Sequence, residues 1–141
     1  MTNTIKPAAE SICLLDDDPA VRKSISRLLA CEGFAVRSFS EPKNFLAHLQ
    51  EHHSVRLAIL DVWMEEMNGL EIQTEVSKIS AQTRVIIITA DANPVTKNTA
   101  LNAGAIAFFI KPFDDEEFLT VVRSAIPQGT PTSNEPGVPL S

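Results

Sequence analysis

The sequence lacks long hydrophobic runs and clusters of basic residues, and each absence excludes a class of protein. Its apolar runs, such as Val85–Ile88, are far too short to cross a bilayer, and no signal peptide opens the chain. We therefore expect a cytoplasmic protein without membrane contact. The net charge is -6 and no Lys or Arg cluster is present, so direct nucleic acid binding by this domain is not expected.

Cysteine is also scarce. Cys13 and Cys31 are the two cysteines, and they lack the CxxC spacing of metal or redox motifs. We interpret both as reduced thiols rather than as a disulfide. The chain of 141 residues, with 44% hydrophobic and 21% charged residues, suffices for one globular domain with its own core.

Short apolar segments alternate with segments of helical periodicity between residues 11 and 126. The expected strands are residues 11–15, 34–39, 57–60, 85–88 and 106–110, each followed by a helix. Such strands are typical of a parallel sheet covered on both faces, and right-handed crossovers then give an α/β doubly wound fold. Residues 1–10 are interpreted as a polar lead-in. Residues 127–141, rich in Pro and Gly, are interpreted as a tail or linker.

Three consecutive aspartates follow the first expected strand. Asp18 precedes Pro19, which is the pattern of a helix N-cap followed by proline at the first helical position. Asp16 and Asp17 have no such local explanation, and two neighbouring carboxylates repel one another. A bound cation would offset this repulsion.

Other polar residues end the remaining apolar strands. Asp61 ends the third strand, Thr89 the fourth, and Lys111 follows the fifth. Ligands of open α/β sheets bind at this carboxyl edge. Clustered carboxylates suit Mg²⁺, and an aspartate can accept a phosphoryl group as an acyl phosphate. A hydroxyl and an ammonium nearby could hold the phosphoryl oxygens.

The motifs L-L-D-D-D-P, L-A-I-L-D-V-W-M-E-E-M-N-G-L, V-I-I-I-T-A and F-F-I-K-P-F together resemble the receiver domains of two-component response regulators. The resemblance covers roughly residues 9–126 and implies the five-stranded, five-helix flavodoxin-like fold. The later half of the chain is similar to the subgroup of nitrogen-fixation and nitrogen-regulation regulators.

The resemblance implies a phosphorylation-dependent signalling switch rather than an enzyme with a separate substrate. Asp61 would accept the phosphoryl group from a histidine kinase. Mg²⁺ would be held by Asp16, Asp17, Asp61 and the backbone carbonyl of Trp63. Lys111 would pair with Asp61 and then with the phosphoryl group.

The resemblance also implies how the signal leaves the site. Thr89 would bond a phosphoryl oxygen, and Phe108 would occupy the aromatic switch position, where tyrosine is common in the family. Output would pass to a downstream protein or output domain through the last two helices and the fifth strand. A phosphorylation-dependent homodimer is compatible with the same surface.

Two alternatives stay open at this point. The chain could be a phosphatase of the haloacid dehalogenase kind, with Asp16 as the nucleophile of an Asp-x-Asp pattern. It could also be a degenerate receiver that binds proteins without phosphorylation, a reading that Glu65 favours because the family usually has proline there. His48, His52 and His53 lack a further strong ligand, so we interpret them as a solvated helix end rather than a metal site.

Overall fold

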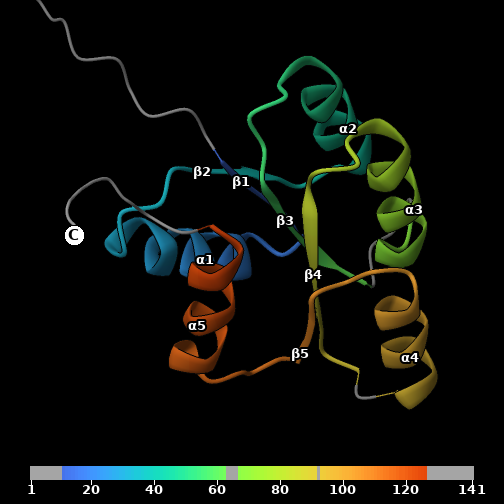
Figure 1. Ribbon diagram of the computed structural model, residues 1–141. Coiled ribbons are helices and arrows are strands. Elements are labelled where there is room, and N and C mark those ends of the chain that lie inside the picture. The colour runs from blue at the N-terminus through green and yellow to red at the C-terminus, as the bar shows by residue number, and fades with distance from the viewer. Residues whose placement is uncertain (1–10, 63–66, 92, 127–141) are drawn as a thin grey trace, which may run out of the picture.

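The computed structural model describes residues 11–62, 67–91 and 93–126, in which strands and helices alternate (Figure 1). The strands are β1 (Ile12–Leu15), β2 (Val36–Phe39), β3 (Leu57–Asp61), β4 (Arg84–Thr89) and β5 (Ala107–Ile110). The helices are α1 (Pro19–Cys31), α2 (Pro42–Glu51), α3 (Gly69–Ile79), α4 (Pro94–Asn102) and α5 (Asp115–Ala125). The expected lead-in and tail lie outside the described residues.

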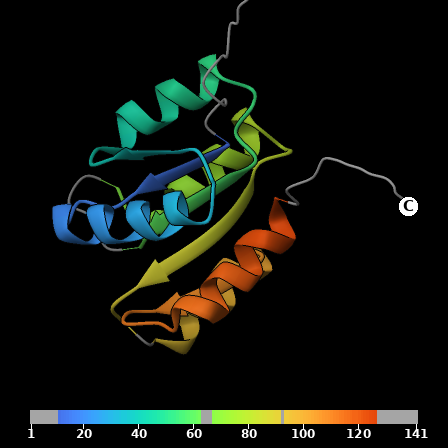
Figure 2. The same cartoon turned by 90° about the vertical axis from the view of Figure 1, so that its left-hand side faces the viewer.

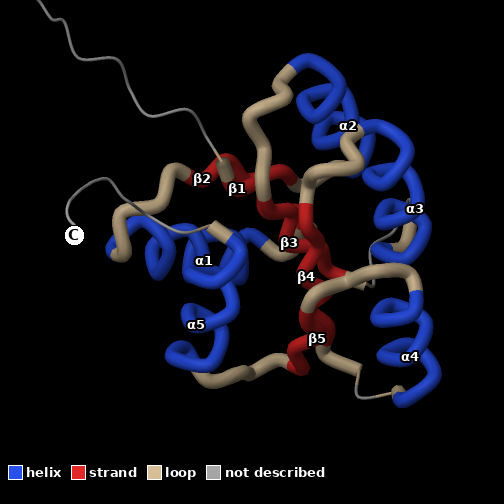
Figure 3. Tube along the Cα trace, viewed as in Figure 1, coloured by secondary structure: helices blue, strands red, loops and turns tan. Residues whose placement is uncertain are grey.

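The strands form one parallel sheet in the order β2-β1-β3-β4-β5. In Figure 3 this sheet is a central layer with helices on both sides. The predicted α/β doubly wound fold with five strands and five helices is therefore confirmed. The chain turns to opposite sides of the sheet after β1 and after β3, which places a topological switch point between these two strands.

Each face of the sheet carries its own hydrophobic core. Helices α1 and α5 cover one face, and α2, α3 and α4 cover the other (Figures 1 and 2). Because successive strand residues point to opposite faces, Ile59 belongs to the core under α1 and α5, whereas Leu60 belongs to the core under α2–α4. In the part of the chain that is described, no helix is long and apolar enough to cross a membrane.

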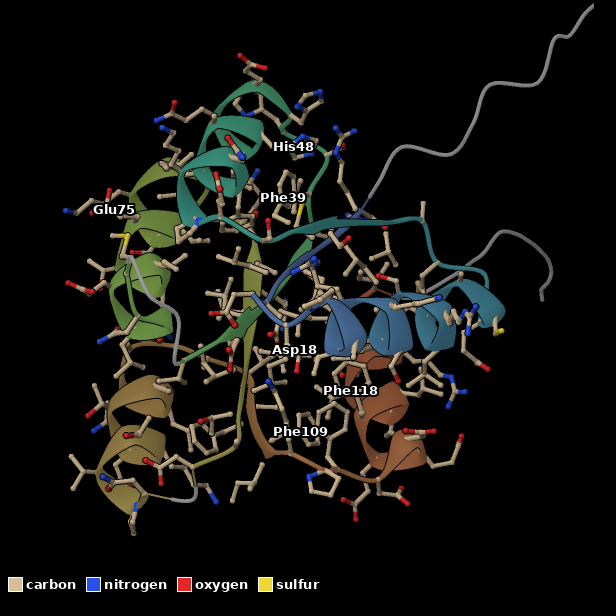
Figure 4. The ribbon with its side chains drawn as sticks, turned by 180° about the vertical axis from the view of Figure 1, so that it is seen from behind. Asp18, Phe39, His48, Glu75, Phe109 and Phe118 are labelled. Atoms are coloured by element: carbon tan, nitrogen blue, oxygen red, sulfur yellow. The ribbon has the colours of Figure 1, made fainter. Side chains whose placement is uncertain are left out.

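Side-chain caps fix where several helices begin. The N–H of Ala20 donates to Asp18 Oδ1 at 2.9 Å, which confirms Asp18 as the N-cap of α1 (Figure 4). Asn68 and Glu71 form a capping box at the start of α3. These caps set the ends of the loops that leave the carboxyl edge of the sheet.

The edge strands differ from the sequence prediction. Phe34 precedes β2 because its N–H donates to Leu29 O at 3.1 Å, closing α1 with Gly33 at a φ of 88°. Strand β2 exposes its central residues, and β5 is only partly buried. Both lie at the edges of the sheet, where one strand neighbour is missing and cover is incomplete.

The prediction of a solvated histidine cluster was wrong for His48. Its side chain is 9% exposed and packs at 5.3 Å from the ring of Phe39, as Figure 4 shows at α2. The His48 and His52 rings stack at 4.0 Å. His48 faces the sheet because α2 turns the same side as buried Phe45 and Leu49 towards β2.

Candidate functional site

The carboxyl edge brings together charged residues from three separate strand ends. Asp16 follows β1, Asp61 ends β3, and Lys111 follows β5. Lys111 Nζ lies 2.8 Å from Asp16 Oδ2 and 3.3 Å from Asp61 Oδ1. Asp16 is fully buried and Asp61 is 5% exposed. The site therefore contains a nearly solvent-free carboxylate pair bridged by one ammonium.

Asp17 completes an acidic cluster with these two carboxylates. One carboxylate oxygen from each of Asp16, Asp17 and Asp61 lies within 4.8 Å of the others. Asp17 itself is exposed, so the cluster opens to solvent on its side. Oxygen donors at this spacing form a set that suits a hard divalent cation.

Burial and like charge change the acidity of Asp61. The pKa of Asp61 is raised from 3.8 to about 6, mainly by burial and then by the charge of Asp16. The Lys111 ammonium opposes this rise through its charge and its hydrogen bond. A shifted carboxyl group of this kind is typical of functional sites.

For the pKa of Lys111, the effect of burial is outweighed by the neighbouring charges. Burial acts to lower the pKa of Lys111, but the hydrogen bond and the charge of Asp16, together with the charge of Asp61, outweigh burial and raise it. The ammonium form is therefore favoured in the protein. Lys111 therefore places a positive charge beside the two buried carboxylates.

Three further contacts hold Asp16 in place, from the loop after β1, from β2 and from α1. Asp16 Oδ1 accepts the N–H of Asp18 at 2.9 Å, and the N–H of Asp16 donates to Phe39 O at 3.2 Å. The guanidinium of Arg22 donates to the backbone carbonyl of Asp16 at 2.7 Å. Arg22 was not among the residues predicted from the sequence. A cation one turn into the helix after an acidic strand end is the signal that could have identified it.

Gly69 packs on the backbone of Asp61, the candidate phosphoacceptor. A Cβ at this position would lie 2.5 Å from Asp61 O and 3.0 Å from Val62 Cα. The N–H of Gly69 also donates to Val62 O at 2.9 Å. Only glycine allows α3 to begin this close to the end of β3.

Thr89 and Phe108 lie on the same face of the sheet. Phe108 is half-buried and packs against the core under α2–α4, and alternation from Ile87 places Thr89 on that face too. The Thr89 hydroxyl is buried and accepts the N–H of Asp91 at 3.1 Å. Asp61 of β3 pairs with Ile88 of β4, and Thr89 is the next residue of β4 after Ile88.

Two residues singled out in the sequence lie outside the described residues. These are Trp63, with its backbone carbonyl, and Glu65. The structure brings together the other expected metal residues and Lys111, and it places Thr89 and Phe108 on neighbouring strands.

Comparison with known proteins gives the same class as the fold and the site. A family model described as the response regulator receiver domain matches residues 12–123. The chain therefore belongs to the response regulator receiver family, whose domains are phosphorylation-dependent signalling switches. Neither the phosphatase alternative nor the degenerate receiver gains support from this match.

The chain is also similar to individual response regulators. Response regulator protein TodT of Pseudomonas putida strain F1 is 37% identical over 118 residues, covering 84% of this chain and 52% of TodT. The DNA-binding transcriptional regulator NtrC of Azospirillum brasilense is 31% identical over 129 residues, covering 92% of this chain and 27% of NtrC. The chain thus spans about half or less of the length of these relatives.

Solved receiver structures share the fold. A CheY-like receiver domain protein from Methanospirillum hungatei JF-1 superposes with a TM-score of 0.77 at 26% identity, covering 83% of this chain and 93% of that one. The beryllofluoride-activated NtrC4 receiver domain dimer gives 0.78 at 26% identity, covering 83% and 96%.

Proposed function

We propose that Asp61 accepts a phosphoryl group from the phosphohistidine of a sensor histidine kinase, in a reaction that requires Mg²⁺. The observation that carries this proposal is the position of Asp61 at the centre of the site. Its carboxylate lies within 4.8 Å of those of Asp16 and Asp17 and 3.3 Å from Lys111 Nζ. The proposal extends the receiver family's role to particular residues of this chain.

The donor set fits a magnesium ion. The carboxylates of Asp16, Asp17 and Asp61 supply hard oxygen ligands, and the backbone carbonyl of Trp63 is the proposed fourth protein ligand. Bound Mg²⁺ supplies positive charge that offsets the repulsion among these carboxylates and the transferring phosphoryl oxygens. Asp17 is exposed, so solvent reaches the cluster on that side.

The transfer itself needs an ionised Asp61. One of its carboxylate oxygens attacks phosphorus, an O–P bond forms, and the P–N bond to the kinase histidine breaks with its electron pair returning to the imidazole. Lys111 is near enough to Asp61 to stabilise charge on the phosphoryl oxygens. Water later attacks phosphorus, the O–P bond to Asp61 breaks, and inorganic phosphate leaves while the carboxylate is restored. The domain therefore converts no separate substrate.

The same site is proposed to drive the switch. In this structure the Thr89 hydroxyl is engaged by the N–H of Asp91. A phosphoryl group on Asp61 offers a charged acceptor to the Thr89 hydroxyl and draws Thr89 towards it. The movement of Thr89 then leaves space for Phe108 on the shared face of the sheet. Phe108 has no hydroxyl, so its position depends on packing alone.

The proposed output surface is formed by α4, β5 and α5. Its exposed apolar side chains are Val95, Leu101 and Ile110. Apolar groups at such a surface suit a protein partner: an output domain, a downstream protein or a second phosphorylated copy. We place the reaction in the cytoplasm, without nucleic acid bound by this domain, and assign the switch to residues 11–126 between the lead-in and the tail.

Intact mass spectrometry tests the assignment. The wild-type protein is incubated with acetyl phosphate and Mg²⁺, in parallel with Asp61→Asn and with Asp91→Asn, an exposed carboxylate at the same edge. We expect one added phosphoryl group in the wild type and in Asp91→Asn, and none in Asp61→Asn or with EDTA. A phosphoryl group retained in Asp61→Asn would mean that another residue accepts it. Phosphorylation of Asp16 would favour the phosphatase alternative.

A further inference from the structure

Arg22 contacts the backbone, not the carboxylates, of the loop that carries Asp16 and Asp17. It lies in the second turn of α1, half-buried, and its guanidinium Nη1 donates to the backbone carbonyl of Asp16 at 2.7 Å. The contact goes to the main chain, so both carboxylate oxygens of Asp16 keep their own partners, the N–H of Asp18 and Lys111 Nζ. Arg22 thus fixes the loop without occupying a ligand atom of the cluster.

The peptide group that Arg22 holds is the one that joins Asp16 to Asp17. This unit is planar, so the direction of the Asp16 carbonyl also sets the direction of the Asp17 N–H and the start of the Asp17 backbone. Among the described residues, the carboxylate of Asp17 has no hydrogen bond or ion pair that would orient it. Its place within 4.8 Å of Asp16 and Asp61 therefore depends on the backbone.

We propose that Arg22 is a positioning residue for the metal site: by holding the carbonyl of Asp16, it places the carboxylate of Asp17 where a divalent cation can use it. This inference rests on the proposed function, because it takes Asp16, Asp17 and Asp61 as the Mg²⁺ ligands. Residues that orient metal ligands typically change metal affinity 10–100-fold when they are removed.

A positioning role and a purely electrostatic role predict opposite changes. Removing a positive charge next to three carboxylates strengthens the attraction for Mg²⁺, so an electrostatic role predicts tighter binding in Arg22→Met. A positioning role predicts weaker binding in the same variant, because Asp17 loses its fixed backbone. The sign of the change in affinity therefore separates the two.

The test measures the Mg²⁺ dissociation constant of the full chain from the fluorescence of its single tryptophan, Trp63, and from amide shifts of Asp17. Arg22→Met is compared with Arg27→Met, which removes the same charge from an exposed position of α1. Arg22→Lys keeps the charge and a donor with a different reach. Circular dichroism confirms that each variant is folded.

We expect Mg²⁺ binding to weaken about tenfold in Arg22→Met, with partial recovery in Arg22→Lys and no weakening in Arg27→Met. Phosphorylation by acetyl phosphate then needs more Mg²⁺ in Arg22→Met but reaches the wild-type rate at saturation. Unchanged or tighter Mg²⁺ binding in folded Arg22→Met, or a rate defect that persists at saturating Mg²⁺, would overturn the positioning role. A wild-type protein that neither binds Mg²⁺ nor accepts phosphate at Asp61 would instead contradict the proposed function.

Discussion

Lys111 Nζ lies closer to Asp16 than to Asp61, at 2.8 Å against 3.3 Å. The ammonium therefore neutralises the more deeply buried carboxylate, and the candidate phosphoacceptor receives the longer contact. Burial and the charge of Asp16 raise the pKa of Asp61 by more than Lys111 lowers it. The pKa of Asp61 is therefore about 6. This arrangement leads to the first two predictions.

Replacing Lys111 by methionine should destabilise the metal-free protein. The change leaves Asp16 and Asp61 buried without their cation, and breaking a buried pair in this way costs about 3 kcal/mol. We expect the loss at pH 7.5 and a smaller loss at pH 5, where Asp61 takes up a proton. Urea unfolding in EDTA measures the stability at both pH values. Lys97→Met, at an exposed position of α4, is the control. Equal stability of Lys111→Met and the wild type at pH 7.5 would contradict the prediction.

Asp61→Asn should stabilise the metal-free protein in a pH-dependent way. The folded-state pKa of Asp61 is raised to about 6 from 3.8, so the ionised side chain disfavours folding. This penalty is absent below pH 3.8, grows as pH rises to 6 and is complete above it. It amounts to about 3 kcal/mol at most.

The measurement is the difference in unfolding free energy between Asp61→Asn and the wild type from pH 4 to pH 8 in EDTA. We expect the difference to rise up to pH 6 and then to level off. Asp91→Asn, at an exposed position, is measured in parallel as the control. A difference that falls with increasing pH would reverse the sign of the pKa shift.

Gly69→Ala should disturb both stability and the site. The added Cβ would lie 2.5 Å from Asp61 O, and the neighbouring atoms are backbone, which cannot rotate away. Overpacking of this kind costs about 1–3 kcal/mol, and relief requires β3 or α3 to move. Urea unfolding gives the cost, and the rate of phosphorylation by acetyl phosphate reports the displaced Asp61.

Ser77→Ala, exposed on the same helix, is the matched control for this change and should leave both quantities near wild type. Full stability and an unchanged phosphorylation rate in Gly69→Ala would mean that α3 can withdraw from Asp61 without consequence for the site.

Thr89→Ala should uncouple the site from α4. The buried hydroxyl is the group proposed to respond to a phosphoryl group, and its removal also leaves the N–H of Asp91 without this acceptor. We expect beryllofluoride still to bind, while the amide shift of Val95 on α4 no longer changes. NMR spectra recorded with and without beryllofluoride test this. A Val95 shift as large as in the wild type would show that the signal bypasses Thr89.

Much of the fold could be predicted because its signals are local. Apolar runs located the strands, and helical periodicity located the helices other than weakly apolar α4. Asp18 before Pro19 located the first cap. The polar residues at successive strand ends identified Asp16, Asp61 and Lys111, since parallel strands bring their carboxyl ends to one edge. His48 was misjudged because it was interpreted by its polar type. Its position three residues after Phe45 places it on the buried side of α2, where it packs against Phe39.

The sequence by itself determined which residue types stand at the end of each strand, because alternation, capping and turn chemistry act between near neighbours. Only the tertiary structure decided that Lys111 favours Asp16, 95 residues away, that Arg22 reaches back to a carbonyl, and that Gly69 touches the backbone of Asp61. These contacts depend on how closely packed layers approach one another. That approach is set by the whole core together, and differences of a few tenths of an ångström decide which partner an ion or a backbone group meets.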